Sequence, residues 1–347
     1  MQLWYTRCPL PTASSVAIER GLLEEAFAPR GIEVQSLNAS SDMAVREAHY
    51  DHRQAHLFRQ GGNIPPIWSR ARGADTVVVA TNWIDEYQAV VALPGSGIHQ
   101  AADLRGRRLG LPRRVNEQVD YWRAMCQRGY EAALASAGLA SVDAEFVELA
   151  IDEKQITAGG ESRRGTLWRG GNRARRQSRE ALALIRGEVD AIYTAGAPGA
   201  QLSAFMSAYT VADLGTQADR ARHVNNQVPT VLTVDGELAR TAPEVVARYL
   251  HVLMGAADWA RDHGRETLAI VSSDVGATAE WVSAAYGSDV HRQLGLDLDE
   301  RSISAIEAQK EFLLQRGYIE ADFDVRRWID PVPMAIAREM QHERPTA

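Results

Sequence analysis

Short apolar stretches alternate with longer amphipathic ones from one end of the chain to the other. Apolar stretches rich in β-branched residues are typical of buried strands. Such strands are expected at residues 3–5, 31–34, 75–80, 88–93 and 230–234. Stretches with the apolar periodicity of a helix are found at residues 14–25, 118–135, 243–260 and 302–316. This alternation predicts an α/β fold in which mainly parallel sheets are flanked by helices.

Two phrases indicate a two-lobed chain: the first marks a change of lobe, and the return crossing is expected near residues 210–214. Residues 98–111, IHQAADLRGRRLGL, combine a short helix, a glycine turn and a strand. Residues 183–193, ALIRGEVDAIY, combine a helix that stops at Gly187 with a strand whose end reaches a cleft. Both resemble phrases of type II periplasmic-binding-protein folds. The resemblance implies lobe one at residues 1–96 and 212–347, lobe two at residues 97–211, and a ligand cleft between them.

The charge and the apolar runs of the chain limit the kinds of partner that the protein is expected to bind. The net charge of -7 gives no reason to expect nucleic acid or an anionic membrane as a partner. No apolar run is long enough to span a membrane, and residues 1–8 lack the features of a secretory signal. The sequence therefore predicts a cytoplasmic protein, in which Cys8 and Cys126 are free thiols by default. Cys126 falls in the helix expected at residues 118–135, so we interpret it as a packing residue.

The segment 159–179 differs in amino-acid composition from the rest of the chain. It carries seven arginines among glycines and small polar residues. An anion-binding lid is one interpretation, and a mobile, solvated loop is the other. The pattern favours the loop, because blocks of like charge are usually flexible.

Cys8 lies between the first expected strand and a proline turn that leads into a helix. Functional residues of α/β proteins often occupy this position, and a helix N-terminus with nearby arginine or histidine lowers the pKa of a thiol. Most free cysteines, in contrast, are small buried hydrophobes. Both interpretations are open on the pattern alone.

Three histidines, His49, His52 and His56, stand at spacings that could share one face of a helix, with Asp51 between them. This arrangement raises the possibility of zinc. The segment has no second ligand group at a recognisable spacing, so we expect no metal. Further along, Arg59 precedes a Gly61-Gly62 turn that Pro65 and Pro66 follow. Glycine backbone N–H groups and an adjacent guanidinium can bind an oxyanion, although an ordinary glycine turn has the same pattern.

Several of these phrases together resemble the family of aromatic sulfinate desulfinases. They are YTRCPLPTA at residues 5–13, H-x9-R-x-GG-N-IPP at residues 49–66, WARDH at residues 259–263 and EFLLQRGYIEADFDVRRW at residues 311–328. The likeness follows the chain in order, except at about 113–180, where it is poor. The family releases sulfite from an aromatic sulfinate, and the resemblance implies the same reaction type here more firmly than the same substrate.

The resemblance also implies roles for individual residues. Cys8 corresponds to the essential cysteine, His49 to the active-site histidine and Arg59 to the arginine that binds the sulfinate. Gly62, with Gly61 beside it, is expected to offer a backbone N–H to the sulfinate. Four further residues are expected to bind substrate, namely Thr6, Tyr50, Tyr193 and Thr194. Cys8 is either a proton donor or a nucleophile, and no cofactor is required by this chemistry.

Two other functions compete with this hypothesis. The lobe-crossing phrases fit a non-catalytic solute-binding protein for a sulfonate, sulfinate or carboxylate, which would work with an ABC permease outside the cytoplasm. The same superfamily also contains a pyrimidine-precursor synthase, but its cysteine-rich iron motif is not found here. The partner expected under the first hypothesis is a small anionic substrate.

Overall fold

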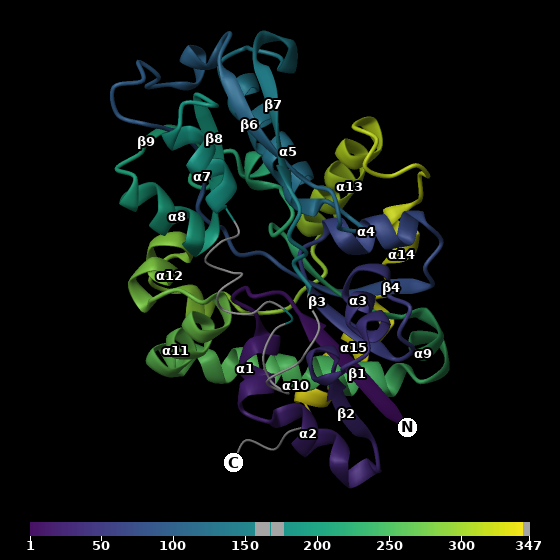
Figure 1. The fold of residues 1–347 in the computed structure, drawn as a ribbon. Helices are drawn as coiled ribbons and strands as arrows, with labels where there is room; N and C mark the ends of the chain where they lie inside the picture. Colours follow the sequence, from purple (N-terminus) through teal and green to yellow (C-terminus); the bar gives the residue numbers. More distant parts are fainter. Residues whose placement is uncertain (157–166, 168–176, 343–347) are drawn as a thin grey trace.

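Two five-stranded sheets form the framework of the computed structural model, which describes residues 1–156, 167 and 177–342 (Figure 1). The first sheet, in the order β2-β1-β3-β10-β4, consists of β1 (Gln2–Arg7), β2 (Glu33–Ser36), β3 (Leu57–Gly61), β4 (Thr76–Asn82) and β10 (Thr230–Asp235). The second sheet, in the order β7-β6-β8-β5-β9, consists of β5 (Gln88–Ala92), β6 (Arg108–Arg114), β7 (Glu145–Ile151), β8 (Ala191–Ala195) and β9 (Tyr209–Asp213).

Helices surround both sheets. Those from the two ends of the chain are α1 (Ala13–Glu19), α2 (Leu22–Phe27), α3 (Met43–Asp51), α4 (Ile64–Ala71), α9 (Gly236–Thr241), α10 (Pro243–Asp262), α11 (Gly264–Val275), α12 (Ala279–Tyr286), α13 (Glu300–Gln315), α14 (Val325–Trp328) and α15 (Val332–His342). Those from the middle are α5 (Tyr121–Ser136), α7 (Ser178–Ile185) and α8 (Gly196–Phe205). Short 3-10 turns are η1 (Ala28–Arg30), η2 (Leu37–Ala39), η3 (Ala101–Leu104), η4 (Ser141–Asp143), η5 (Arg220–His223) and η6 (Val290–Arg292).

Each sheet has one strand that runs against the others. β10 pairs antiparallel with β3 and β4, whereas β1 pairs parallel with β2 and β3. In the second sheet, β5 pairs antiparallel with β8 and β9, whereas β6 pairs parallel with β7 and β8. These two strands, β5 and β10, are each the first strand along the chain after it crosses from one sheet to the other. The expected α/β fold with mainly parallel sheets is therefore confirmed.

The chain passes between the sheets at two crossings, residues 83–87 and 214–229. The first crossing comes before β5, whereas the sequence placed the change of lobe at residues 96 and 97. The reason is that the phrase at 98–111 forms η3, a left-handed turn at Gly106 and β6, all of which follow β5 in the second lobe. The segment 159–179, apart from residues 167 and 177–179, lies outside the described residues.

The helix expected at residues 14–25 is two helices in the structure. α1 ends at Glu19 and α2 begins at Leu22, because Gly21 between them adopts a left-handed conformation with φ of 71°. The helices expected at 118–135, 243–260 and 302–316 are confirmed as α5, α10 and α13. Cys126 on α5 has no exposed surface, as its interpretation as a packing residue requires.

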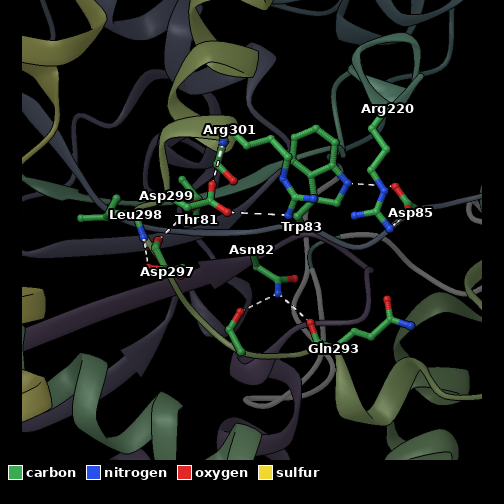
Figure 2. A network of polar contacts seen from close by, with 12 residues as sticks. Thr81, Asn82, Trp83, Asp85, Arg220, Gln293, Asp297, Leu298, Asp299 and Arg301 are labelled. Carbon is green, nitrogen blue, oxygen red and sulfur yellow. Dashed lines mark hydrogen bonds and ion pairs between the residues drawn. The ribbon is translucent and has the colours of Figure 1, made fainter. Parts of the chain in front are cut away.

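The two crossings lie side by side and contact one another through polar groups (Figure 2). On the first crossing, Asp85 accepts a hydrogen bond from Trp83 Nε1 at 2.8 Å. It also pairs with Arg220 at 3.2 Å and His223 at 2.8 Å, both on the second crossing. Burial raises the pKa of Asp85, but the hydrogen bonds from His223 and Trp83 outweigh it, and the pKa is lowered overall. The Arg301 guanidinium lies over the Trp83 ring, 4.4 Å from the ring centroid.

The lobes also contact one another on both sides of the crossings. Arg128 of α5 donates a hydrogen bond to the Ala308 carbonyl of α13 at 3.2 Å. On the other side, α8 packs against α12 (Figure 1). The Phe205 and Trp281 rings meet there edge to face, with their centroids 6.0 Å apart. Any site between the lobes is therefore flanked by packed helices. Within the described ranges, no helix is long and apolar enough to cross a membrane.

Candidate active site

Cys8 follows β1 directly and extends its pairing with β3 by one residue. In the ladder between β1 and β3, Thr6 stands opposite Arg59, and the Cys8 backbone N–H donates to the Gln60 carbonyl at 2.9 Å. The cysteine side chain consequently lies against Gly61. A Cβ atom at residue 61 would come within 2.3 Å of Cys8 Sγ, so a glycine is required there by close approach.

His49 joins the two strands to α3. Asp42 caps this helix by accepting a hydrogen bond from the Ala44 backbone, and His49 lies near its C-terminal end, fully buried. Its Nδ1 atom lies 2.8 Å from Thr6 Oγ1, and its Nε2 atom lies 3.6 Å from Cys8 Sγ. Burial lowers the pKa of His49 well below its ordinary value, and the charge of Arg59 lowers it further. The imidazole is therefore neutral near pH 7.

The neighbours of His49 favour one tautomer. Arg59 Nη2 lies 3.5 Å from His49 Nε2, and a guanidinium can only donate. Nε2 therefore carries no proton, and Nδ1–H donates to Thr6 Oγ1. In this form Nε2 can accept the proton of the Cys8 thiol, and Thr6 serves as the positioning residue of the histidine.

Arg59 is a buried cation in the centre of the site. Its Nε donates to the His49 carbonyl at 2.8 Å, and its Nη1 donates to the Gly62 carbonyl at 2.9 Å. Its Nη2 faces Cys8 Sγ at 3.8 Å. Among the described residues, no carboxylate pairs with Arg59, and burial lowers its pKa. A buried cation held only by neutral groups favours an anionic ligand.

A small cavity lies over these residues, with a volume of about 10 Å³, which is room for about one water molecule. Its walls are formed by Cys8, Pro9, His49, Tyr50, Arg59, Pro65, Tyr121, Asn226 and Gln227. Tyr121 comes from α5 of the second lobe, and its ring lies 6.5 Å from that of Tyr50. Asn226 and Gln227 come from the second crossing. The site is thus built by both lobes and by the connection between them.

The structure brings most of the residues predicted from the sequence together, but two lie elsewhere. Tyr193 is buried in the second lobe, where its hydroxyl donates to Gln88 Oε1 at 2.8 Å. Thr194 is buried beside Ser203, with 3.2 Å between their hydroxyl oxygens. Neither lines the cavity at Cys8, because both side chains are enclosed by neighbours in the second lobe. Conversely, Tyr121, Asn226 and Gln227 line the cavity without any motif that marks them.

The other two histidines do not share a helical face with His49. α3 ends at Asp51, and His52 and His56 both have left-handed backbones, with φ of 59° and 55°. His52 Nε2 lies 2.9 Å from Thr233 Oγ1, behind the site, and His56 Nδ1 lies 3.1 Å from a backbone carbonyl of β1. In the part of the chain that the structure describes, no three histidine, cysteine or acidic side chains are placed to hold a metal ion.

His52→Asn is expected to weaken the loss of stability in acid. Burial lowers the pKa of His52 to about 3, so the folded chain keeps it neutral while the unfolded chain protonates it below about pH 6.5. The stability this provides is present above pH 6.5 and is lost as the pH falls, by about 1.4 kcal/mol per pH unit for each such histidine. Asparagine tolerates the left-handed backbone of residue 52.

Urea denaturation at pH 7.5 and pH 5.0 measures this effect. The fall in the free energy of unfolding between these pH values should be about 2 kcal/mol smaller in His52→Asn than in the wild type. His99→Asn, at an exposed histidine, is the control and should leave the fall unchanged. An equal fall in His52→Asn and the wild type would contradict the assignment of a neutral, partly buried His52.

The two-lobed fold is shared with a sulfonate-binding protein. The periplasmic aliphatic sulphonate binding protein SsuA from Escherichia coli superposes with a TM-score of 0.66 and 16% identity, covering 95% of this chain and 92% of that chain. No protein-family model matches the sequence. The expected periplasmic-binding-protein-like fold is confirmed.

More particular similarity leads to the desulfinases. The chain is 27% identical over 350 aligned positions to 2'-hydroxybiphenyl-2-sulfinate desulfinase of Rhodococcus erythropolis, covering 95% of this chain and 91% of the relative. The crystal structure of the desulfurization enzyme DSZB superposes with a TM-score of 0.77 and 25% identity, covering 99% of both chains. A mutant of DSZB in complex with biphenyl-2-sulfinic acid gives a TM-score of 0.74 at 25% identity, covering 97% of this chain and 99% of that one. The resemblance to desulfinases expected from the sequence phrases is confirmed.

Proposed function

We propose that this protein is a desulfinase, which hydrolyses the carbon–sulfur bond of an aromatic or related sulfinate and releases sulfite. The observation that carries the proposal is the convergence of Cys8, His49 and Arg59, in which a thiol, a neutral imidazole and an unpaired buried guanidinium meet within 3.5 to 3.8 Å. The similarity to sulfinate desulfinases over nearly the whole chain supports the same reaction.

The sulfinate is expected to bind with its oxygens at Arg59. Its single negative charge is shared by two oxygens, which suits a guanidinium together with a backbone N–H donor such as that of Gly62. This binding would direct the sulfur toward Cys8, whose Sγ lies 3.8 Å from the same guanidinium. Tyr50 and Tyr121 offer apolar ring surface for the aromatic part of the substrate.

Two chemical routes fit the geometry. In the first, the Cys8 thiol protonates the ring carbon, the carbon–sulfur bond breaks to release sulfur dioxide, and water converts sulfur dioxide to sulfite and returns a proton through His49. In the second, the Cys8 thiolate attacks sulfur, the ring carbon leaves and takes a proton, and water hydrolyses the sulfur–sulfur bond of the intermediate. Each route consumes one sulfinate and one water and produces one arene and one sulfite.

Sulfite release from a panel of aromatic and aliphatic sulfinates tests the proposal. We expect the wild-type protein to release sulfite from at least one aromatic member, and the preferred member begins to define the substrate. The alternative is a non-catalytic sulfonate- or sulfinate-binding protein, which the likeness of fold to SsuA favours. Tight binding of a sulfinate with no sulfite from any panel member would support that alternative, and a signal sequence in the full gene would be needed as well to establish it. An ABC permease is the expected partner only under that alternative. A cytoplasmic location and independence of cofactors stay predictions.

A further inference from the structure

Asn226 is fixed over the turn that follows β3. It is 3% exposed and lies on the second crossing. Its backbone carbonyl accepts a hydrogen bond from the Asn63 N–H at 2.7 Å, and its Oδ1 accepts one from the Ile64 N–H at 2.9 Å. Its own N–H donates to Asn225 Oδ1 at 2.9 Å. The side-chain amide therefore has a single defined orientation.

In this orientation, the amide nitrogen of Asn226 can donate a hydrogen bond to a ligand. The Ile64 N–H can only donate, so the atom it meets must be the amide oxygen, and Nδ2 is the other end of the group. Among the described residues, Nδ2 has no hydrogen-bond partner, and Asn226 lines the cavity with Cys8 and Arg59. An NH₂ group that faces a cavity without a protein acceptor can donate to a ligand or to water.

Gly62 provides the space that this amide occupies. A Cβ atom at residue 62 would lie 2.5 Å from both Nδ2 and Oδ1 of Asn226, so the amide lies flat against the glycine backbone. The carbonyl of the same glycine accepts a hydrogen bond from Arg59 Nη1 at 2.9 Å. The amide of Asn226 and the guanidinium of Arg59 thus approach the same turn, and both reach the same cavity.

The second lobe holds the neighbouring residue, which secures the position of Asn226. Asn225 Nδ2 lies within hydrogen-bond distance of three acceptors in the second lobe, namely Met125 O at 3.1 Å, Tyr193 Oη at 3.2 Å and Gln88 Oε1 at 3.3 Å. From the first lobe, Asn63 Nδ2 donates to the Asn225 carbonyl at 2.8 Å. Contacts from both lobes preorganise the donor, so that it needs no rearrangement when a ligand enters.

We propose that Asn226 is a further substrate-binding residue, whose Nδ2 donates a hydrogen bond to an oxygen of the bound sulfinate or of the sulfite produced from it. The class of anion rests on the proposed function, whereas the anion-binding role of the amide rests on the geometry above. Arg59 and Asn226 would then bind the anion from two different elements, β3 and the second crossing. This arrangement makes recognition of the anion depend on how the lobes are placed.

Asn226→Asp is the sharpest test, since it preserves the shape and the acceptor for the Ile64 N–H but replaces the donor with a negative oxygen. The probe is benzenesulfonate, whose binding to wild-type and variant chains is measured by calorimetry at pH 7.5. We expect Asn226→Asp to bind it at least about 30-fold more weakly, because a charge-assisted hydrogen bond is lost and a repulsion is added. Asn116→Asp adds the same charge at an exposed asparagine and should bind within twofold of the wild type.

Thermal unfolding of each variant accompanies the binding measurement. If Asn226→Asp does not fold, Asn226→Ser replaces it, and we expect Asn226→Ser to bind benzenesulfonate about tenfold more weakly than the wild type. Binding by the Asn226 variant within threefold of the wild type would overturn the inference, as would a wild-type chain that does not bind benzenesulfonate. Sulfite release is measured on the same samples. Weakened binding in Asn226→Asp with no sulfite from the wild type would support the inference while the proposed function fails. Sulfite release by the wild type together with unchanged binding in Asn226→Asp would support the proposed function while the inference on Asn226 fails.

Discussion

Cys8→Ser is expected to lower the rate of sulfite release at least about 1000-fold. Both routes require the thiol, either as the acid that protonates carbon or as the thiolate that attacks sulfur. A serine hydroxyl is a far weaker acid and, beside a neutral His49, a far weaker nucleophile. Sulfite released per minute from the preferred sulfinate, at saturating concentration, measures the effect.

The second cysteine provides the matched control for this prediction. Cys126 is buried on α5 without contact to the cavity, and burial raises the pKa of its thiol well above the ordinary value. Cys126→Ala should therefore keep sulfite release within about threefold of the wild type. A Cys8→Ser variant that still cleaves the sulfinate at a tenth of the wild-type rate would remove Cys8 from the chemistry.

Arg59→Lys is expected to lower kcat/KM at least about 100-fold, although it keeps the positive charge. A lysine has no planar fork and cannot donate simultaneously to the His49 and Gly62 carbonyls and to the substrate. The loss should be visible in KM, because anion binding is weakened, and in kcat, because the sulfur is no longer directed at Cys8. Steady-state kinetics with the preferred sulfinate separates the two.

Arg128→Lys controls for the cost of changing an arginine that holds a backbone carbonyl away from the cavity. Arg128 is partly buried, and its Nε donates to the Val224 carbonyl at 2.7 Å, but it lies outside the cavity. We expect its kcat/KM to fall less than tenfold. Equal losses in Arg59→Lys and Arg128→Lys would show that the effect of Arg59 is on folding rather than on the substrate.

The cluster of Cys8, His49 and Arg59 was expected from the resemblance to sulfinate desulfinases, because the local pattern alone left the roles of these residues open. Cys8 and Arg59 stand in phrases that follow or end neighbouring strands, and strand pairing then places them together. Tyr121 and Asn226 had no such signal. They reach the cavity only through the packing of α5 and the second crossing, at sequence separations that no local pattern spans.

The differences between expectation and structure have local causes. The single helix expected at residues 14–25 is divided because Gly21 takes a left-handed conformation. The spacing of the three histidines would allow one shared helical face, but a left-handed backbone at His52 ends α3 before the periodicity can continue. Tyr193 and Thr194 were placed at the ligand by the direction of their strand alone. Their side chains are instead enclosed by neighbours within the second lobe.

The most direct test of the central claim follows both products of one reaction in heavy water. Biphenyl-2-sulfinate is incubated with the wild-type protein in D₂O, and sulfite and biphenyl are quantified together by ion chromatography and mass spectrometry. The account predicts one sulfite for each biphenyl, with one deuterium on the carbon that carried sulfur, and no turnover with Cys8→Ser. If the wild type leaves biphenyl-2-sulfinate and every other sulfinate of the panel unchanged, the assignment as a desulfinase is contradicted.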